Sequence, residues 1–228
     1  MKYFVKPSPN ETVFGLIYFF LQLLILPAIL LVVNMMLPNP LAEAEINVVV
    51  FAMNFLAVLI IFRKFLVANF HPILENPMFA LRCAGIGALI YMGGNAIVSV
   101  VVTLIDPGFT NVNDAMIMGM VQENFGLMTL GTVVLVPLAE ECFYRALIFR
   151  NLYDKRPWIA YAVSMVLFGL AHVVGYITMY DIGTLAICFL QYLPAGFALA
   201  WAYRRSGSIY ASILIHMSVN QVGMLLMR

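Results

Sequence analysis

The chain has 228 residues, of which 64% are hydrophobic and only 10% charged, and its mean hydropathy is +0.98. Soluble domains carry about a quarter charged residues, so this composition indicates a membrane protein with several spans. The net charge is +1, and no block of Lys and Arg could follow a phosphate backbone, which excludes nucleic acid as a partner.

Seven stretches are long and apolar enough to cross a bilayer, which takes about 20 helical residues. The first is too long for the hydrophobic region of a signal peptide and has no A-x-A cleavage site, so we expect a retained span. The sequence predicts an all-α, polytopic transmembrane helix bundle that forms a single integral membrane domain over residues 1–228. A polar stretch between the third and fourth spans can hold a short interfacial helix. In chain order the spans are 13–36, 46–68, 82–105, 124–150, 157–176, 181–203 and 207–227.

The basic residues predict the orientation in the lipid bilayer. With an odd number of spans, alternate loops fall on opposite sides, and the basic residues concentrate on the inner side. One side holds every basic residue except Arg228, so we expect the N-terminus inside and the C-terminus outside. The residues of that side are Lys2, Lys6, Arg63, Lys64, Arg82, Arg145, Arg150, Lys155, Arg156, Arg204 and Arg205.

Three charges remain inside the fourth span, in the segment "PLAEECFYR". A charge there costs at least about 2.5–3.5 kcal/mol on insertion scales, so each is a candidate functional group. Glu141 and Arg145 are four residues apart and share a helix face, whereas Glu140 points about 100° away. We expect Arg145 to neutralise Glu141 and to leave Glu140 free to act. Pro137 removes a backbone donor and is expected to disturb the helix close to Glu140.

Two of the three histidines also lie within spans. His172 follows Phe168 by four residues, and Asn220 follows His216 by four, so each pair shares a helix face. A rise of about 1.5 Å per residue places Glu140 and these polar groups at similar depths, about 14–22 Å from the inner side. Each group alone could be an interhelical hydrogen bond. Their convergence favours a shared site.

This set of groups suits hydrolysis by an activated water. Glu140 fits a general base and His172 can hold or orient the water. His216 and Asn220 can donate hydrogen bonds to an oxyanion. A second arrangement stays open, in which Glu140, His172 and His216 are the three protein ligands of a catalytic zinc. The spacing is not HExxH, so the zinc arrangement rests only on the number of ligands, and both arrangements stay open.

Two smaller patterns predict contacts between helices. Glycines in the third span, Gly85, Gly87, Gly93 and Gly94, can allow a neighbouring helix to approach closely. Gln191 lies within the sixth span, and we expect its amide to form an interhelical hydrogen bond.

The order of the polar motifs resembles a known family. "EECFYR" fits an EExxxR motif, "FGLAH" an FxxxH motif and "HMSVN" an HxxxN motif. These motifs are similar to those of the CAAX-protease and bacteriocin-processing family, also called CPBP or Abi proteins, which are intramembrane peptidases. The resemblance covers about residues 130–221, and the three motifs together are specific although each alone is weak.

The resemblance implies an intramembrane endopeptidase of the cell membrane with a site reached from the cytoplasmic side. Glu140 and His172 would activate the water, and His216 and Asn220 would stabilise the oxyanion. With this resemblance we favour a glutamate-type mechanism without a cofactor and keep zinc as the alternative. Its substrate would be a membrane-embedded protein or a leader peptide.

By the same resemblance, Glu141 and Arg145 support the site, and we add Phe168 of the FxxxH motif. Two other classes of function stay open. A non-catalytic membrane regulator or bacteriocin-immunity protein could use the same fold, because fold and motif do not settle activity. A small transporter could also bury Glu and His, although no paired repeats are evident.

Overall fold

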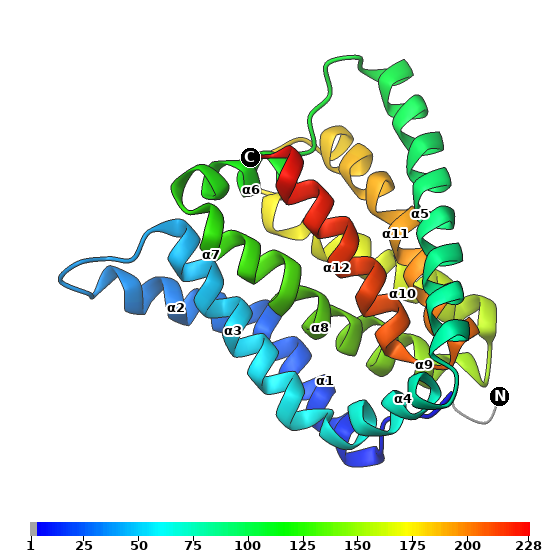
Figure 1. Ribbon diagram of the computed structural model, residues 1–228. Coiled ribbons are helices and arrows are strands. Elements are labelled where there is room, and N and C mark those ends of the chain that lie inside the picture. Colours follow the sequence, from blue (N-terminus) through cyan, green and yellow to red (C-terminus); the bar gives the residue numbers. More distant parts are fainter. Residues whose placement is uncertain (1–3) are drawn as a thin grey trace.

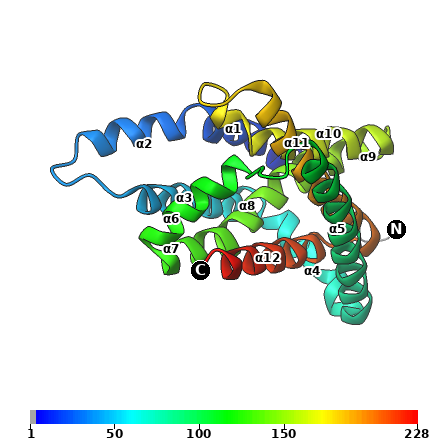
Figure 2. The same cartoon turned by 90° about the horizontal axis from the view of Figure 1, so that it is seen from above.

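The computed structural model describes residues 4–228, so Lys2, counted above with the inner-side residues, lies outside the described residues. Within 4–228 the regular elements are all helices, which confirms the predicted all-α bundle (Figures 1 and 2). They are α1 (Pro9–Leu24), α2 (Leu26–Met35), α3 (Glu43–Ile61), α4 (Arg63–Glu75), α5 (Pro77–Ile105), α6 (Val112–Glu123), α7 (Phe125–Thr129), η1 (Leu130–Leu135), α8 (Val136–Glu141), η2 (Cys142–Phe149), α9 (Arg150–Tyr153), α10 (Pro157–Ala171), η3 (Val174–Tyr176), α11 (Ile182–Ser206) and α12 (Ile209–Leu226).

Among the described residues, six helices are long and apolar enough to cross a membrane, and a bent pair, α1 with α2, would make a seventh. The predicted first span over 13–36 is bent, because α1 and α2 meet at an angle of 44°. Pro27 lies at the start of α2 and cannot donate a hydrogen bond to the carbonyl of Leu23. The missing bond accounts for the break at this point in the chain.

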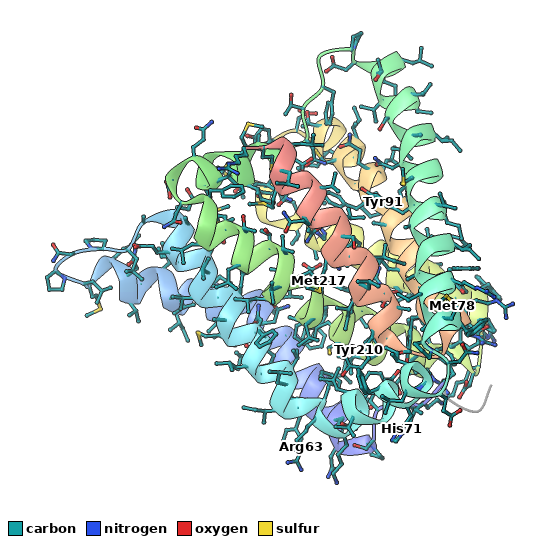
Figure 3. All side chains as sticks on the ribbon, viewed as in Figure 1. Arg63, His71, Met78, Tyr91, Tyr210 and Met217 are labelled. Atoms are coloured by element: carbon teal, nitrogen blue, oxygen red, sulfur yellow. The ribbon has the colours of Figure 1, made fainter. Side chains whose placement is uncertain are left out.

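The predicted second span, 46–68, also ends earlier than expected. Helix α3 stops at Ile61, and Phe62 leaves helical geometry at φ −97° and ψ 19° before α4 begins. The break falls immediately before the charged pair Arg63 and Lys64. Figures 1 and 3 show Arg63 and His71 at the end of the bundle where α1 begins, whereas the C-terminus lies near α6 and α7.

The fourth span runs without interruption from Phe125 to Tyr153 but becomes π-helical in two places. Elements η1 and η2 are π-helical, and the short α-helix α8 between them carries Glu140 and Glu141. π-helical turns are rare and occur frequently at functional sites. The two carboxylates therefore sit between two π-helical stretches of a 29-residue apolar span.

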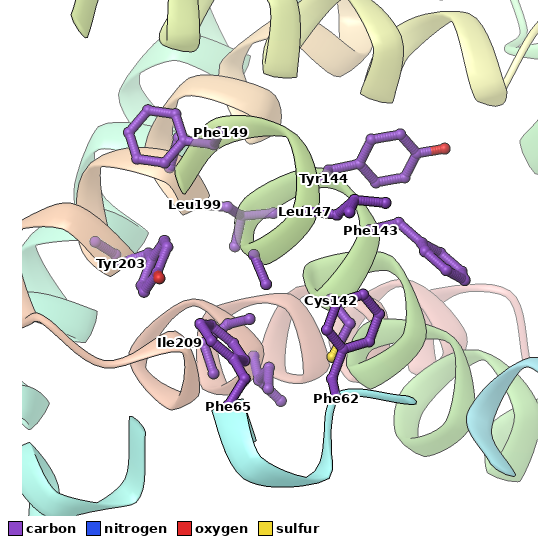
Figure 4. Packing of buried hydrophobic residues seen from close by; sticks show 14 of the residues in the cluster. Phe62, Phe65, Cys142, Phe143, Tyr144, Leu147, Phe149, Leu199, Tyr203 and Ile209 are labelled. Atoms are coloured by element: carbon purple, nitrogen blue, oxygen red, sulfur yellow. The ribbon is translucent and has the colours of Figure 1, made fainter. Parts of the chain in front are cut away.

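Helix α12 crosses the middle of the bundle, with α8 and η1 on one side and α5 and α11 on the other (Figure 1). The main apolar core gathers beside it and joins α4, η2, α11 and α12 (Figure 4). Phe65, Cys142, Tyr203 and Ile209 are almost fully buried there. This core holds the fourth span against α12 and so positions the polar groups that the two elements carry.

Candidate active site

Glu141 and Arg145 form the ion pair that their spacing predicts. The Nε atom of Arg145 lies 3.2 Å from Oε2 of Glu141, and both side chains are 0% exposed. Arg145 also donates from Nη2 to the carbonyl of Gly196 on α11, at 3.3 Å. Its guanidinium carbon lies 4.5 Å from the ring centre of Phe168 on α10, a cation–π contact. The pair thus fixes the fourth span to two further helices.

His216 on α12 extends this pair into a chain of contacts. Its Nδ1 atom lies 3.0 Å from Oε1 of Glu141, and its Nε2 atom lies 3.7 Å from Oε2 of Glu140. Because a carboxylate can only accept, Nδ1 carries the hydrogen and donates it to Glu141. In the neutral ring Nε2 then holds a lone pair, and it can donate only when the ring is doubly protonated.

The Glu141–His216 contact was not predicted. The sequence predicted an ion pair of Glu141 with Arg145 alone and grouped His216 with Asn220. In the structure Glu141 contacts both Arg145 and His216 in the interior. Glu140 is separate from Arg145, as expected: its only ion-pair contact within residues 4–228 is with His216. The Glu140 side chain is 23% exposed, yet its Oε2 atom is buried and has no hydrogen bond.

His172 ends α10, and its ring bonds to its own helix. The backbone N–H of His172 donates to Gly169, which leaves the carbonyl of Phe168 to accept from Nδ1 of the ring, at 2.8 Å. Nδ1 therefore carries the hydrogen, and Nε2 of the neutral ring is an acceptor. The ring lies between Phe168, at 4.7 Å between centroids, and Tyr192 of α11, at 4.1 Å.

The predicted convergence of the two histidines occurs through Phe168. The Phe168 ring lies 4.7 Å from His172 and 5.9 Å from His216 between centroids. Within residues 4–228 no hydrogen bond or ion pair joins His172 to Glu140. Phe168, named from sequence as a supporting residue, therefore contacts both imidazole rings and the guanidinium of Arg145.

Asn220 bonds to η1, through a carbonyl that the helix leaves free. Its Nδ2 atom donates to the backbone oxygen of Thr132 at 2.7 Å. In π-helical geometry the N–H of Val136 bonds to Gly131, and the next residue, Pro137, has no N–H for Thr132. The proline that was expected to disturb the helix near Glu140 thus supplies the acceptor for Asn220. One N–H of the amide remains for another partner.

The three candidate zinc ligands do not form a metal centre. Across the described part of the chain, no three His, Cys, Asp or Glu side chains gather closely enough to hold a metal ion. Glu140 and His216 approach each other, but within residues 4–228 no hydrogen bond or ion pair joins His172 to either of them. The donor set does not fit the three-ligand arrangement, and no step below passes through a metal.

The comparisons with known proteins agree with the motifs. Residues 122–222 match the family model described as Type II CAAX prenyl endopeptidase Rce1-like. This segment contains every candidate residue from Glu140 to Asn220. The resemblance to CAAX-type membrane peptidases that the motifs predict is therefore confirmed over residues 122–222.

Two curated bacterial relatives match part of the chain. The "UPF0177 protein YxdF" of Lactococcus lactis is 33% identical over 90 residues, which is 40% of this chain and 44% of the relative. The "Putative membrane peptidase YdiL" of Bacillus subtilis is 32% identical over 95 residues, or 41% of this chain and 34% of the relative. The match thus spans less than half the length of either relative. No solved structure matches the chain.

Proposed function

We propose that this protein is an intramembrane endopeptidase that hydrolyses a peptide bond of a membrane-embedded or leader-peptide substrate with an activated water. The observation that carries the proposal is the buried chain of contacts from Arg145 through Glu141 and His216 to Glu140. The family match supports the reaction class, and the name of the Bacillus subtilis relative agrees with it.

Glu140 is the general base of this proposal. Its buried Oε2 atom has no hydrogen bond and lies 3.7 Å from Nε2 of His216. That separation is too long for a hydrogen bond, so Oε2 keeps its lone pairs for a water. As the water oxygen bonds to the substrate carbonyl carbon, its proton passes to Glu140, which then protonates the amine when the carbon–nitrogen bond breaks. His172, with Nε2 as an acceptor, helps to orient the water.

His216 and Asn220 stabilise the oxyanion that forms. The amide of Asn220 is held by Thr132 and keeps one N–H for the substrate oxygen. His216 can donate from Nε2 only as an imidazolium, because Nδ1–H is bound to Glu141. The carboxylates of Glu140 and Glu141 then balance the guanidinium of Arg145 and the imidazolium of His216. The net charge of these four side chains is therefore zero.

Further parts of the proposal concern location and cofactor. The concentration of Lys and Arg on alternate loops supports an N-terminus in the cytoplasm and a site open toward that side of the cell membrane. No metal takes part in the proposed steps, so a zinc chelator should leave cleavage unchanged.

The test is cleavage of a panel of fluorogenic membrane and leader peptides by purified protein. Wild type is compared with Glu140→Gln and with Glu43→Gln, which neutralises an exposed carboxylate on α3. We expect a loss of about 100-fold or more in Glu140→Gln, full activity in Glu43→Gln and no effect of the chelator. Full cleavage by Glu140→Gln would overturn the mechanism. No cleavage by wild type, with the cellular phenotype intact in Glu140→Gln, would favour a non-catalytic regulator.

A further inference from the structure

A second polar cluster lies where α6 begins, outside the residues assigned to the site. Asn111, the residue before α6, is 7% exposed, and its Nδ2 atom donates to Oε1 of Gln191 on α11, at 2.7 Å. Its Oδ1 atom accepts from the backbone N–H of Asn113 at 2.9 Å and from the hydroxyl of Tyr192 at 3.3 Å. The amide of Asn111 therefore caps α6 and binds α11 at the same time.

This cluster reaches the candidate site through one ring. Tyr192 stacks on His172 with 4.1 Å between centroids and 24° between planes. The Tyr192 hydroxyl donates its hydrogen bond to Oδ1 of Asn111. On the opposite side His172 contacts the ring of Phe168 at 4.7 Å. The imidazole is thus enclosed between two aromatic rings, and its Nδ1 is bound to a carbonyl.

The position of His172 in the chain makes this enclosure necessary. His172 follows the last residue of α10, and the chain then enters a turn before η3, so helical packing restrains the ring from one side only. The bond from Nδ1 to Phe168 fixes one point of the ring, and rotation about that bond would still move Nε2. A flat contact with Tyr192 opposes this rotation because it fixes the plane of the ring.

We propose that Tyr192 is a positioning residue for His172, and that Asn111 holds Tyr192 in place from the cap of α6. The catalytic consequence rests on the proposed function, whereas the stacking itself does not. Neither residue touches the reacting atoms. A misplacement of about 1 Å at a reacting group can cost about 100-fold in rate, so a residue that only orients His172 can still contribute to activity.

The first measurement is independent of peptidase activity. Full-length protein with isotope-labelled histidine rings is placed in lipid nanodiscs, and the His172 signal is assigned by its loss in His172→Gln. Stacking between two aromatic rings should shift the ring proton of His172 upfield of that of His71, an exposed residue on α4. Tyr192→Leu should remove most of this shift. An unchanged His172 signal in Tyr192→Leu would overturn the proposal.

The second measurement separates positioning from folding. Tyr192→Phe keeps the ring and removes the hydroxyl, so it should retain most of the shift, and kcat should fall by less than in Tyr192→Leu. For Tyr192→Leu we expect a fall in kcat of about tenfold or more, with KM within about twofold. Asn111→Ala should broaden or shift the same signal and lower kcat by a smaller factor.

The matched control is Tyr161→Phe, which removes a tyrosine hydroxyl on α10 where the ring packs against Phe149 and Phe197. It should leave both the His172 signal and kcat at wild-type values. Loss of the stacking shift in Tyr192→Leu with unchanged kcat would overturn the catalytic part of the proposal. A wild-type enzyme without activity but with the stacking shift would remove the proposed function and keep the assignment of the contact.

Discussion

Replacement of Arg145 by leucine tests the buried ion pair at the centre of the site. Both Arg145 and Glu141 are 0% exposed, so the substitution leaves a buried carboxylate without its guanidinium and still in contact with His216. Breaking a buried pair by removing one member costs about 3–5 kcal/mol. The contact of the guanidinium with Phe168, at 4.5 Å, adds about 1 kcal/mol or more. We therefore expect a loss of about 4 kcal/mol or more in the free energy of unfolding.

The assay is equilibrium unfolding in mixed micelles of a mild detergent and dodecyl sulfate, followed by the fluorescence of Trp158 and Trp201. The double variant Glu141→Leu/Arg145→Leu removes both charges, so it should be more stable than Arg145→Leu alone. Recovery of about 2 kcal/mol would show that the uncompensated carboxylate carries the cost. A free energy of unfolding of Arg145→Leu within about 1 kcal/mol of wild type would refute this reasoning. So would a double variant that loses as much stability as Arg145→Leu and Glu141→Leu lose together.

Two further predictions use groups near the site and at the end of the bundle. Hydrogen bonds from Lys6 and Arg150 lower the pKa of Asp154, so their stabilisation is present above the ordinary Asp pKa and is lost as the pH falls through the lowered value. Because Asp154 is half exposed, the free energy of unfolding that is lost with falling pH should stay below about 1 kcal/mol in acid titrations. In Asp154→Asn this pH-dependent loss should be absent. Pro137→Ala restores an N–H that competes with Asn220 for the Thr132 carbonyl, so cleavage should fall about tenfold because Asn220 is held less well. Unfolding measurements should show a change within about 1 kcal/mol, and unaltered cleavage would contradict the role of Pro137.

The local part of the site could be predicted from sequence. Residues four apart on a helix share a face whatever the fold, so the spacing was enough to pair Glu141 with Arg145. The bond from His216 to Glu141 joins residues 75 positions apart, and that from Asn220 to Thr132 joins residues 88 apart. Such contacts depend on how α12 crosses the fourth span, which no local pattern specifies.

The helix contacts show the same limit. A Cβ on Gly87 would lie 2.6 Å from Ile215, and one on Gly94 would lie 2.9 Å from Pro194, so close approach is confirmed at these two positions. Gly85 and Gly93 have no neighbour within 4 Å of a Cβ, which makes the same prediction wrong for them. Gly87 and Gly94 are seven apart and share one face of α5. Sequence alone indicated small residues but not which face α11 and α12 would cover.

Gln191 illustrates a prediction that was right and incomplete. Its expected interhelical hydrogen bond is present, and the partner is Asn111 beside α6. The short helix between the third and fourth spans was predicted only as an interfacial element. Its connection to Tyr192 and His172 could not be read from the sequence, because Asn111 and Tyr192 are 81 residues apart.

The central claim is that Glu140 activates the water for peptide hydrolysis. The most direct measurement is the single-turnover rate of cleavage of one membrane-embedded peptide by wild type and Glu140→Gln, in matched nanodiscs and with a zinc chelator present. The proposal predicts cleavage by wild type under chelation and a rate at least about 100-fold lower in Glu140→Gln. Equal rates in the two proteins, or loss of wild-type cleavage on chelation, would contradict it.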